Sequence, residues 1–216
     1  MIYPEAIEKL SIYFTSEKYQ EDVLDAKREY FADVGIDDKE SDRYEQWMNI
    51  FFDWYLFSRP ISGSNMPPAS FAMEIDEFQQ LLGDEKVLFK NLSQSQHSLL
   101  QFIKVKGDFV YFKDLFRKKK CKVRNKEFTI TLEKGNICDA RLIPEDEDVF
   151  SFTNGFCIHP MEANPFILKE VKALKKASEE EWVEFQIQLV RMFFKMEQYR
   201  HLKLDQIYTR NSKVRF

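Results

Sequence analysis

Glycine is scarce in this chain, with 6 among 216 residues, and the glycines do not cluster in a loop. Loops that bind nucleotide phosphates need closely spaced glycines, because backbone amides must approach the phosphate oxygens. The sequence also lacks the zinc-protease helix and the serine nucleophile motif of hydrolases. These absences argue against a nucleotide-dependent enzyme, and we expect a non-enzymatic protein with no cofactor and no metal.

Long apolar runs are also missing. No apolar run reaches 18 residues, and the first residues, MIYPEAIEKL, are acidic rather than basic. A membrane span needs about 20 apolar residues, and a secretory signal begins with a basic region. The cysteines Cys121, Cys138 and Cys157 are odd in number and widely spaced, which is typical of reduced thiols. We therefore predict a bacterial cytoplasmic protein without membrane contact.

The chain has no strong excess of positive charge. It contains 32 Lys and Arg against 36 Asp and Glu, which gives a net charge of −4 and a pI near 5.6. This balance provides no overall attraction to nucleic acid or to anionic membranes. Any anion-binding function must therefore depend on a local group of basic residues.

Aromatic residues are abundant, above all in residues 44–57. This segment, YEQWMNIFFDWYLF, holds seven aromatic side chains in fourteen positions. Their three-and-four spacing predicts a helix that is apolar around most of its circumference, with one polar stripe that contains Gln46, Asn49 and Asp53. We interpret it as a central core helix. The alternative is an aromatic surface that binds a ligand or stacks on bases.

The order of helical and strand-like segments predicts an α+β fold. We expect an N-terminal helical part at 1–60, a linker with short helices at 61–95, an antiparallel β domain at 96–160 and C-terminal helices at 161–216. In the linker, Ser70 is expected to begin a helix that ends at Gly83. Ser178 and Glu181 form a capping box for the last helix. The N- and C-terminal helices are predicted to pack together, with the β domain inserted between them.

Short strands with period two fill residues 96–160. Lys106, Gly107 and Asp108 predict a turn between two strands, and further strands are expected at 121–124, 128–132 and 137–143. Asp37 or Asp38 is expected to cap the aromatic helix. Asn154 and Gly155 predict a hairpin, because both residues tolerate positive φ. The close spacing of these strands favours a small antiparallel barrel or a strongly bent sheet.

One dense group of basic residues lies at 117–124, where six of eight residues are positive. On a strand, Lys120, Lys122 and Arg124 point to one face, and Lys118 precedes them. Such a basic ladder suits phosphate groups and predicts an anionic-ligand or nucleic-acid site. The alternative is that these lysines protect an exposed sheet edge from pairing with another chain.

A second candidate site is polar or thiol-based and contains Cys157, His159, Asp139 and Arg141. Cys157 and His159 point to one face of a predicted strand, and so do Asp139 and Arg141. A thiol or acid–base function is one reading. The other is a buried unreactive cysteine, with Asp139 and Arg141 joined in an ion pair or in polar contact with the helices. Zinc binding by the cysteines and His159 is disfavoured, because zinc ligands usually come in closely spaced pairs.

The motifs FFDWYLFSRP, GDFVYFKDL and LEKGNICDARLIP, in this order, resemble a group of uncharacterised bacterial proteins. In that group a helix with a Trp-x-Leu-Phe core precedes a small β domain with a Gly-Asp turn and an Ala-Arg-Leu strand. The resemblance covers residues 40–160 and implies no established activity. Some members carry a terminal zinc motif of the preprotein translocase type, which this sequence lacks.

These observations favour an interaction module without enzymatic activity. We expect a protein partner or a homodimer, formed through the apolar face of the last helix. Binding of nucleic acid or another anionic ligand by the basic ladder is the alternative. A thiol or hydrolytic enzyme is a further alternative.

Overall fold

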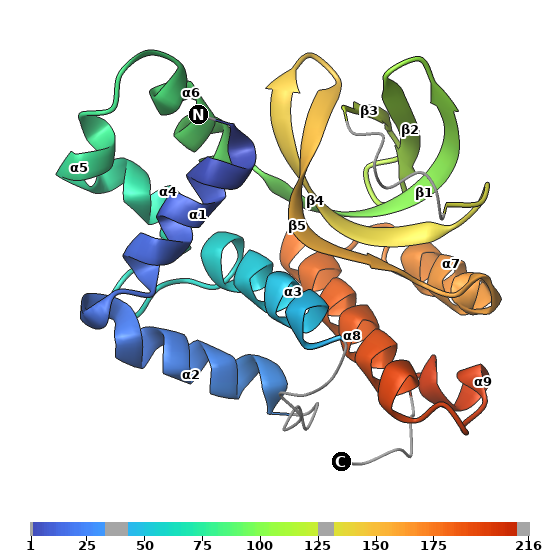
Figure 1. The fold of residues 1–216 in the computed structure, drawn as a ribbon. Helices are drawn as coiled ribbons and strands as arrows, with labels where there is room; N and C mark the ends of the chain where they lie inside the picture. The colour runs from blue at the N-terminus through green and yellow to red at the C-terminus, as the bar shows by residue number, and fades with distance from the viewer. Residues whose placement is uncertain (1, 33–42, 125–131, 211–216) are drawn as a thin grey trace. The chain divides into compact units, whose positions relative to one another are not determined.

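The computed structural model describes residues 2–32, 43–124 and 132–210 (Figure 1). It confirms an α+β protein in which a small barrel lies in sequence between N- and C-terminal helices. The described residues form two compact units, one of 2–32, 43–96 and 141–156, and one of 97–124, 132–140 and 157–210. The four predicted segments, and the packing of the C-terminal on the N-terminal helices, stay predictions.

Helices make up most of the first unit, and α3, Tyr44–Phe57, is its most aromatic element. Phe51 and Tyr55 are fully buried, and their stacked rings have centres 6.1 Å apart. The ring centres of Tyr30 in α2 and Trp54 lie 4.8 Å apart. The Tyr55 hydroxyl lies 3.0 Å from the Phe14 carbonyl oxygen, at the end of α1. The prediction of a central core helix is therefore confirmed. The other helices of this unit are α1 (Tyr3–Phe14), η1 (Glu17–Tyr19), α2 (Gln20–Phe31), α4 (Pro68–Phe71), η2 (Ala72–Glu74), α5 (Asp76–Gln79) and α6 (Gly83–Ser93).

The polar stripe of α3 faces the strand segments of its own unit rather than water. Gln46 donates from Nε2 to the Phe156 carbonyl oxygen at 3.4 Å, and Arg141 Nε donates to Asp53 Oδ2 at 3.0 Å. Arg141 also donates to the Ser58 hydroxyl. Asp53 and Arg141 are 8% and 3% exposed, so their opposite charges compensate each other in a place that excludes water. This pairing is the contact with a helix that was predicted for Arg141.

The prediction of a hairpin at Asn154 and Gly155 is wrong. Strand β5, Val149–Ile158, runs straight through this pair. The turn instead joins β5 to β4, Ile137–Asp146, where Asp148 takes a φ of 57°. Gly155 serves a different need, since a Cβ atom there would lie 2.4 Å from the Asp53 Cβ. Its missing side chain lets α3 approach the strand, which no local pattern reveals.

The strands form a closed barrel in the order β1-β2-β3-β5-β4. The predicted turn at Gly107, with a φ of 60°, joins β1 (Gln96–Lys106) to β2 (Phe109–Asp114) in an antiparallel pair. Strand β3, Lys120–Val123, pairs with the other side of β2. The period-two alternation expected along β1 is interrupted by a shift of register between Phe102 and Lys104. This shift brings Phe102 opposite Phe112, where the two rings pack at 5.8 Å.

Helix α8, Glu179–Gln198, organises the core of the second unit and begins with the predicted capping box of Ser178 and Glu181. Its buried Phe185 and Leu189 join Leu99 of β1 in one apolar cluster. The cluster also includes residues of η4 (Met161–Ala163), α7 (Asn164–Ala173) and α9 (Leu204–Ile207). The apolar stripe predicted on the last helix is therefore packed inside its own unit.

Two further predictions differ from the structure or fall outside it. Gly83 begins α6 instead of ending a helix from Ser70, and three short helical segments occupy residues 68–79. The predicted caps Asp37 and Asp38, and all but the last residue of the strand at 128–132, lie outside the described residues.

Replacement of Gly155 by Ala should destabilise the protein by about 1–3 kcal/mol, because the new Cβ would overlap Asp53 and approach the Asn49 carbonyl oxygen at 3.3 Å. Urea unfolding, followed by tryptophan fluorescence, measures the change. Asn154→Ala is the matched control, since Asn154 is exposed on the same strand. Equal stability of the Gly155→Ala variant and the parent would contradict the close approach.

Candidate functional site

The outward face of β1, β2 and β3 gathers cations around two aromatic rings. On β2 the outward positions are Phe109, Tyr111 and Lys113, while Val110, Phe112 and Asp114 are buried. The paired positions on β1 and β3, together with the residue that follows β3, extend this set. We define the basic face by its eight residues: Lys104, Lys106, Phe109, Tyr111, Lys113, Lys120, Lys122 and Arg124.

The register sets cations on both sides of the rings. Tyr111 is paired with Lys104 on β1 and with Lys122 on β3. The Lys104 ammonium lies 5.8 Å from the centre of the Tyr111 ring. The Lys122 ammonium and the Arg124 guanidinium lie 5.9 and 5.4 Å from the centre of the Phe109 ring. The rings therefore hold part of the positive charge in place, since cations at these distances are attracted to the ring face.

A tight turn between β2 and β3 aligns the basic face. The buried Asp114 carboxylate accepts hydrogen bonds from the backbone amides of Phe116 and Arg117, at 3.0 and 2.8 Å. Lys118 has a φ of 58°, a left-handed conformation that closes the turn, and the Asp114 amide donates to the Lys119 carbonyl oxygen. A buried carboxylate that accepts turn amides stabilises the turn conformation. The turn thereby fixes which side chains of β3 point outward.

The structure separates the predicted basic residues into two groups. Lys120, Lys122 and Arg124 follow one face as predicted, whereas Lys118 is exposed in the turn before β3. Arg117 is engaged inside its own unit, because it donates to Asp114 and to Glu179 and lies 5.7 Å from the Trp182 ring. The predicted ladder is therefore one column of a wider face.

The wider face was missed because only the β3 cations are adjacent in sequence. The residues that β1 and β2 add to the basic face could have been inferred from the predicted hairpin. A turn at Gly107 and Asp108 pairs Lys106 with Phe109 and therefore Lys104 with Tyr111. Counting pairs from the turn could therefore have placed Phe109 and Tyr111 beside these lysines.

Protection of a sheet edge does not account for these lysines. An edge strand has unpaired backbone groups along one side, and lysines there discourage pairing with another chain. In the closed barrel β3 has β2 and β5 as neighbours, so it is not an edge strand. The cations of β1 and β2 likewise lie on strands that have two neighbours.

The second candidate site contains a buried chain of polar groups. Cys157 Sγ lies 3.9 Å from His159 Nε2, and His159 Nδ1 lies 3.1 Å from the Tyr208 hydroxyl. Burial raises the pKa of Cys157 well above its ordinary value and lowers the pKa of His159 to about 4. Both groups are thus neutral near pH 7. A nucleophilic cysteine needs a thiolate that substrate can reach, so this geometry does not favour a thiol enzyme.

Asp139 is buried beside this chain with partners of its own. Its Oδ1 accepts from His97 Nε2 at 2.5 Å, and its Oδ2 lies 3.4 Å from Gln186 Nε2. Gln186 belongs to α8, so the predicted contact between Asp139 and a helix is confirmed. His97, Gln186 and Tyr208 were not predicted, because each lies far in sequence from the strand that it contacts. The group is an interior polar network that connects β1, β4 and α8.

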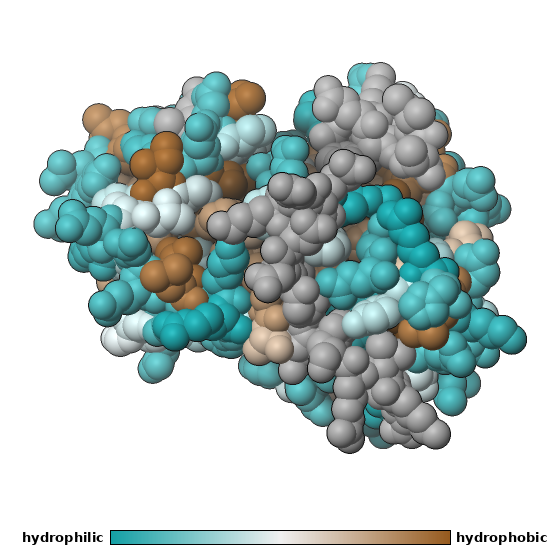
Figure 2. Space-filling model, turned by 60° about the horizontal axis from the view of Figure 1, so that its bottom comes forward, coloured by the Kyte–Doolittle hydropathy of each residue, from teal (hydrophilic) through white to brown (hydrophobic). Residues whose placement is uncertain are grey.

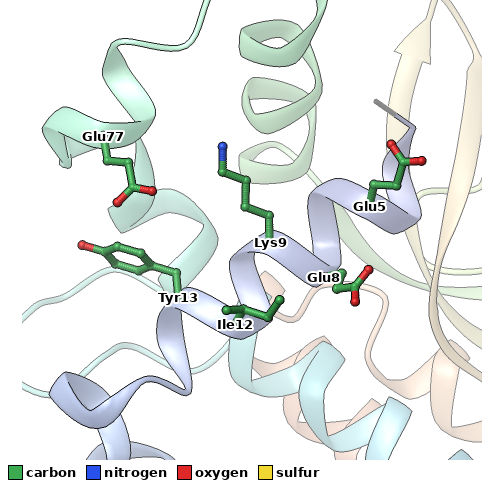
Figure 3. A pocket seen from close by; sticks show the side chains of 6 residues that line it. All are labelled: Glu5, Glu8, Lys9, Ile12, Tyr13 and Glu77. Carbon is green, nitrogen blue, oxygen red and sulfur yellow. The ribbon is translucent and has the colours of Figure 1, made fainter.

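A surface pocket of about 260 Å³ lies on the first unit. It is lined by Glu5, Glu8, Lys9, Ile12, Tyr13 and Glu77. Figure 3 shows the Glu77 carboxylate pointing towards the Tyr13 ring, with Lys9 beside them. The Lys9 ammonium is held over the rings of Phe78 and Phe89, 5.9 and 5.7 Å away. All six lining residues are at least partly exposed, so no buried polar group marks a ligand position.

Exposed apolar side chains are scattered. In Figure 2 apolar residues form separate small patches among hydrophilic ones on the face shown. Small separate patches are ordinary on soluble proteins and do not mark a docking surface. Within the described residues, the exposed large apolar side chains are Ile2, Ile12, Leu24, Leu82, Val87, Val105, Met161 and Leu168. None of them belongs to α8, the helix expected to bind a partner.

In the part of the chain that the structure describes, no three His, Cys, Asp or Glu residues gather to hold a metal ion. No helix there has both the length and the apolar character that a bilayer crossing requires. A model of a family of unknown function (DUF7986) matches residues 7–205, and the chain belongs to that family. No curated protein and no solved structure matches the chain. The family match confirms the predicted resemblance to proteins without an established activity.

The buried His159 should make folding stability depend on pH. Its pKa is about 4 in the folded protein and near 6.5 when unfolded, so the unfolded chain binds more protons between these values. Its contribution is fully present above pH 6.5 and is lost as the pH falls towards 4, by up to about 3 kcal/mol. Urea unfolding at several pH values between 7 and 4 measures this loss.

His159→Gln should remove that part of the pH dependence, even though loss of the contact with Tyr208 lowers stability at pH 7. His201→Gln is the control, because His201 is exposed and its variant should keep the parental pH dependence. If His159→Gln and the parent lose stability equally between pH 6.5 and 4, the histidine is not buried as described.

Proposed function

We propose that this chain binds nucleic acid through the basic face. One observation carries the proposal. Three paired strands present six cations and two rings outward, and none of their outward positions is acidic. Positive charge that follows a surface displaces the counterions condensed on a nucleic acid, and aromatic rings among the cations provide stacking surfaces.

The spacing of the cations strengthens their effect. Neighbouring strands lie about 4.8 Å apart, and alternate residues on one strand about 7 Å apart. Both spacings are below the Debye length of about 8 Å at physiological ionic strength, so the potentials of neighbouring cations add. A local field of this kind can attract a polyanion although the net charge of the chain is −4.

None of the five lysines of the basic face forms an ion pair with a carboxylate among the described residues. A lysine used only for stability would be expected to contact a carboxylate or to cover apolar surface. Lys106, Lys113 and Lys120 are exposed. This exposure supports contact with an external anion.

Binding of a protein partner, or of a second copy through α8, stays an untested prediction. Its premise was the wide apolar arc of the last helix. Phe185 and Leu189 of that arc are buried in the core of their own unit. The residues of the basic face, by contrast, are exposed or partly exposed.

Reversal of two charges, Lys120→Glu with Lys122→Glu, should weaken nucleic-acid binding about tenfold or more at low salt. Removal of two phosphate contacts should also lower the slope of log K against log salt concentration by about 1.4 for a single strand. Fluorescence anisotropy with a labelled oligonucleotide, at salt concentrations from about 50 to 200 mM, measures both effects.

The matched control is Lys175→Glu with Lys176→Glu, which changes the net charge equally at exposed positions after α7. The control should bind like the parent. If both double variants weaken nucleic-acid binding equally, the effect arises from the net charge of the chain and not from the basic face. Absence of measurable affinity in the parent at low salt would reject the proposed function.

A further inference from the structure

We infer that the ligand of the basic face is a single strand, and that two of its bases stack on Phe109 and Tyr111. This inference rests on the proposed function and adds to it the form of the nucleic acid and the way in which it is held. Three features support it: the spacing of the two rings, their partial exposure and the placement of the cations around them.

The spacing of the rings excludes two stacked bases of a duplex. Phe109 and Tyr111 are alternate residues on β2, so their attachment points lie about 7 Å apart. Bases in a duplex strand follow each other every 3.4 Å and cover one another's faces. Two neighbouring bases can therefore occupy both rings only when they are unstacked from each other, which is a property of a single strand.

Phe109 and Tyr111 are partly exposed. The groups that lie over them belong to Lys104, Lys122 and Arg124, whose side chains are flexible and at least partly exposed. A core side chain in the same place would have closed the ring face permanently. An exposed cation–ring contact is weaker than the stacking of a base on the ring. A base can therefore replace the cation, which is then free to contact the adjacent phosphate.

The cations lie where the backbone of such a strand would pass. On β1, Lys104 and Lys106 lie opposite Tyr111 and Phe109. On β3, Lys122 lies opposite Tyr111, and Lys120 lies opposite Lys113, the next outward residue of β2. A single strand that follows β2 thus has its bases over the rings and its phosphates within reach of lysines on either side. Arg124 lies beside Phe109 and suits a phosphate or a base face equally well.

Weak sequence preference follows from the same residues. Reading of base edges requires side chains that donate and accept hydrogen bonds in a fixed geometry. Opposite the outward positions of β2, the uncharged polar partner is Gln101, which is paired with Lys113. Every base has a face that can stack on a ring, so Phe109 and Tyr111 do not distinguish between bases.

The test compares ring variants with a matched control on defined probes. Phe109→Leu and Tyr111→Leu keep an apolar side chain and the charge of the face but remove the ring, whereas Tyr111→Phe keeps the ring. The probes are a labelled oligo(dT) and an oligo(U) of about 12 nucleotides, a duplex of the same length, and heparin as a polyanion without bases. Circular dichroism and urea unfolding of each variant establish that the fold is intact.

Each leucine variant should bind the single strands about fivefold or more weakly, while Tyr111→Phe binds like the parent. Binding of duplex and heparin should be weaker than binding of the single strands and unchanged in the leucine variants. Oligo(dT) and oligo(U) both fit the proposed face, and their ratio reports any contribution of the 2′-hydroxyl.

Photo-crosslinking gives a second readout that a change in stability does not produce. Ultraviolet irradiation of the parent with an oligonucleotide that contains 5-iodouracil should attach it to Tyr111 or Phe109, as mass spectrometry of the digested protein would reveal. A crosslink confined to other segments would overturn the assignment of the rings.

The outcomes separate the two claims. If the parent binds single strand, duplex and heparin alike, and the leucine variants bind as the parent does, stacking is rejected while the basic face remains a nucleic-acid site. If the parent binds none of the probes at low salt, the proposed function fails, and the inference fails with it.

Discussion

The register of β1, β2 and β3 is the constraint on which the basic face depends. A slip of one residue along β2 would send Lys122 inward and bring Cys121 to the surface, because successive side chains of a strand point to opposite faces. Two turns prevent this slip: Gly107 adopts the positive φ that a short hairpin requires, and the buried Asp114 holds the next turn through backbone amides. The shift of register near Ile103 then brings Phe102 into the barrel. The two turns and the shift of register therefore place the charged side chains outside the barrel and the apolar ones inside.

Burial determines the protonation of Cys157 and His159 in the interior of the second unit. Cys157 and His159 are close enough to interact, but desolvation keeps the thiol protonated and the imidazole neutral. Both carboxyl oxygens of Asp139 have partners, His97 and Gln186. A cysteine nucleophile requires a thiolate that substrate can reach, and Cys157 is neither ionised near pH 7 nor exposed.

Sequence patterns predicted those features that depend on local spacing. The aromatic helix at 44–57, the turn at Gly107 and the capping box at Ser178 each follow from residues within a few positions of one another. The Asn154–Gly155 pair led to a wrong prediction of a hairpin, because its role depends on a residue that is distant in sequence. Its glycine is needed by the approach of Asp53, about a hundred residues earlier in the chain, and not by a turn.

The candidate site was predicted only in part for a related reason. The β3 cations are dense in sequence and therefore conspicuous, whereas Lys104 and Tyr111 become neighbours only after the hairpin is folded. Counting residue pairs outward from the turn at Gly107 predicts that Lys104 lies opposite Tyr111. It does not predict the shift of register that interrupts the alternation of β1. The partners of Asp139 and Arg141 come from helices that lie far away in sequence, so a strand pattern could predict a polar contact but not its identity.

The acidic balance of the chain takes on a new meaning beside the basic face. Because six cations are concentrated there while the net charge is −4, the rest of the chain is more acidic than the total indicates. An approaching polyanion is therefore repelled by most of the protein and attracted by one face. Such an arrangement increases the rate of productive encounters and suppresses attachment in other orientations. Under the proposed function, the net negative charge that argued against nucleic acid as a bulk property orients the nucleic acid on the basic face.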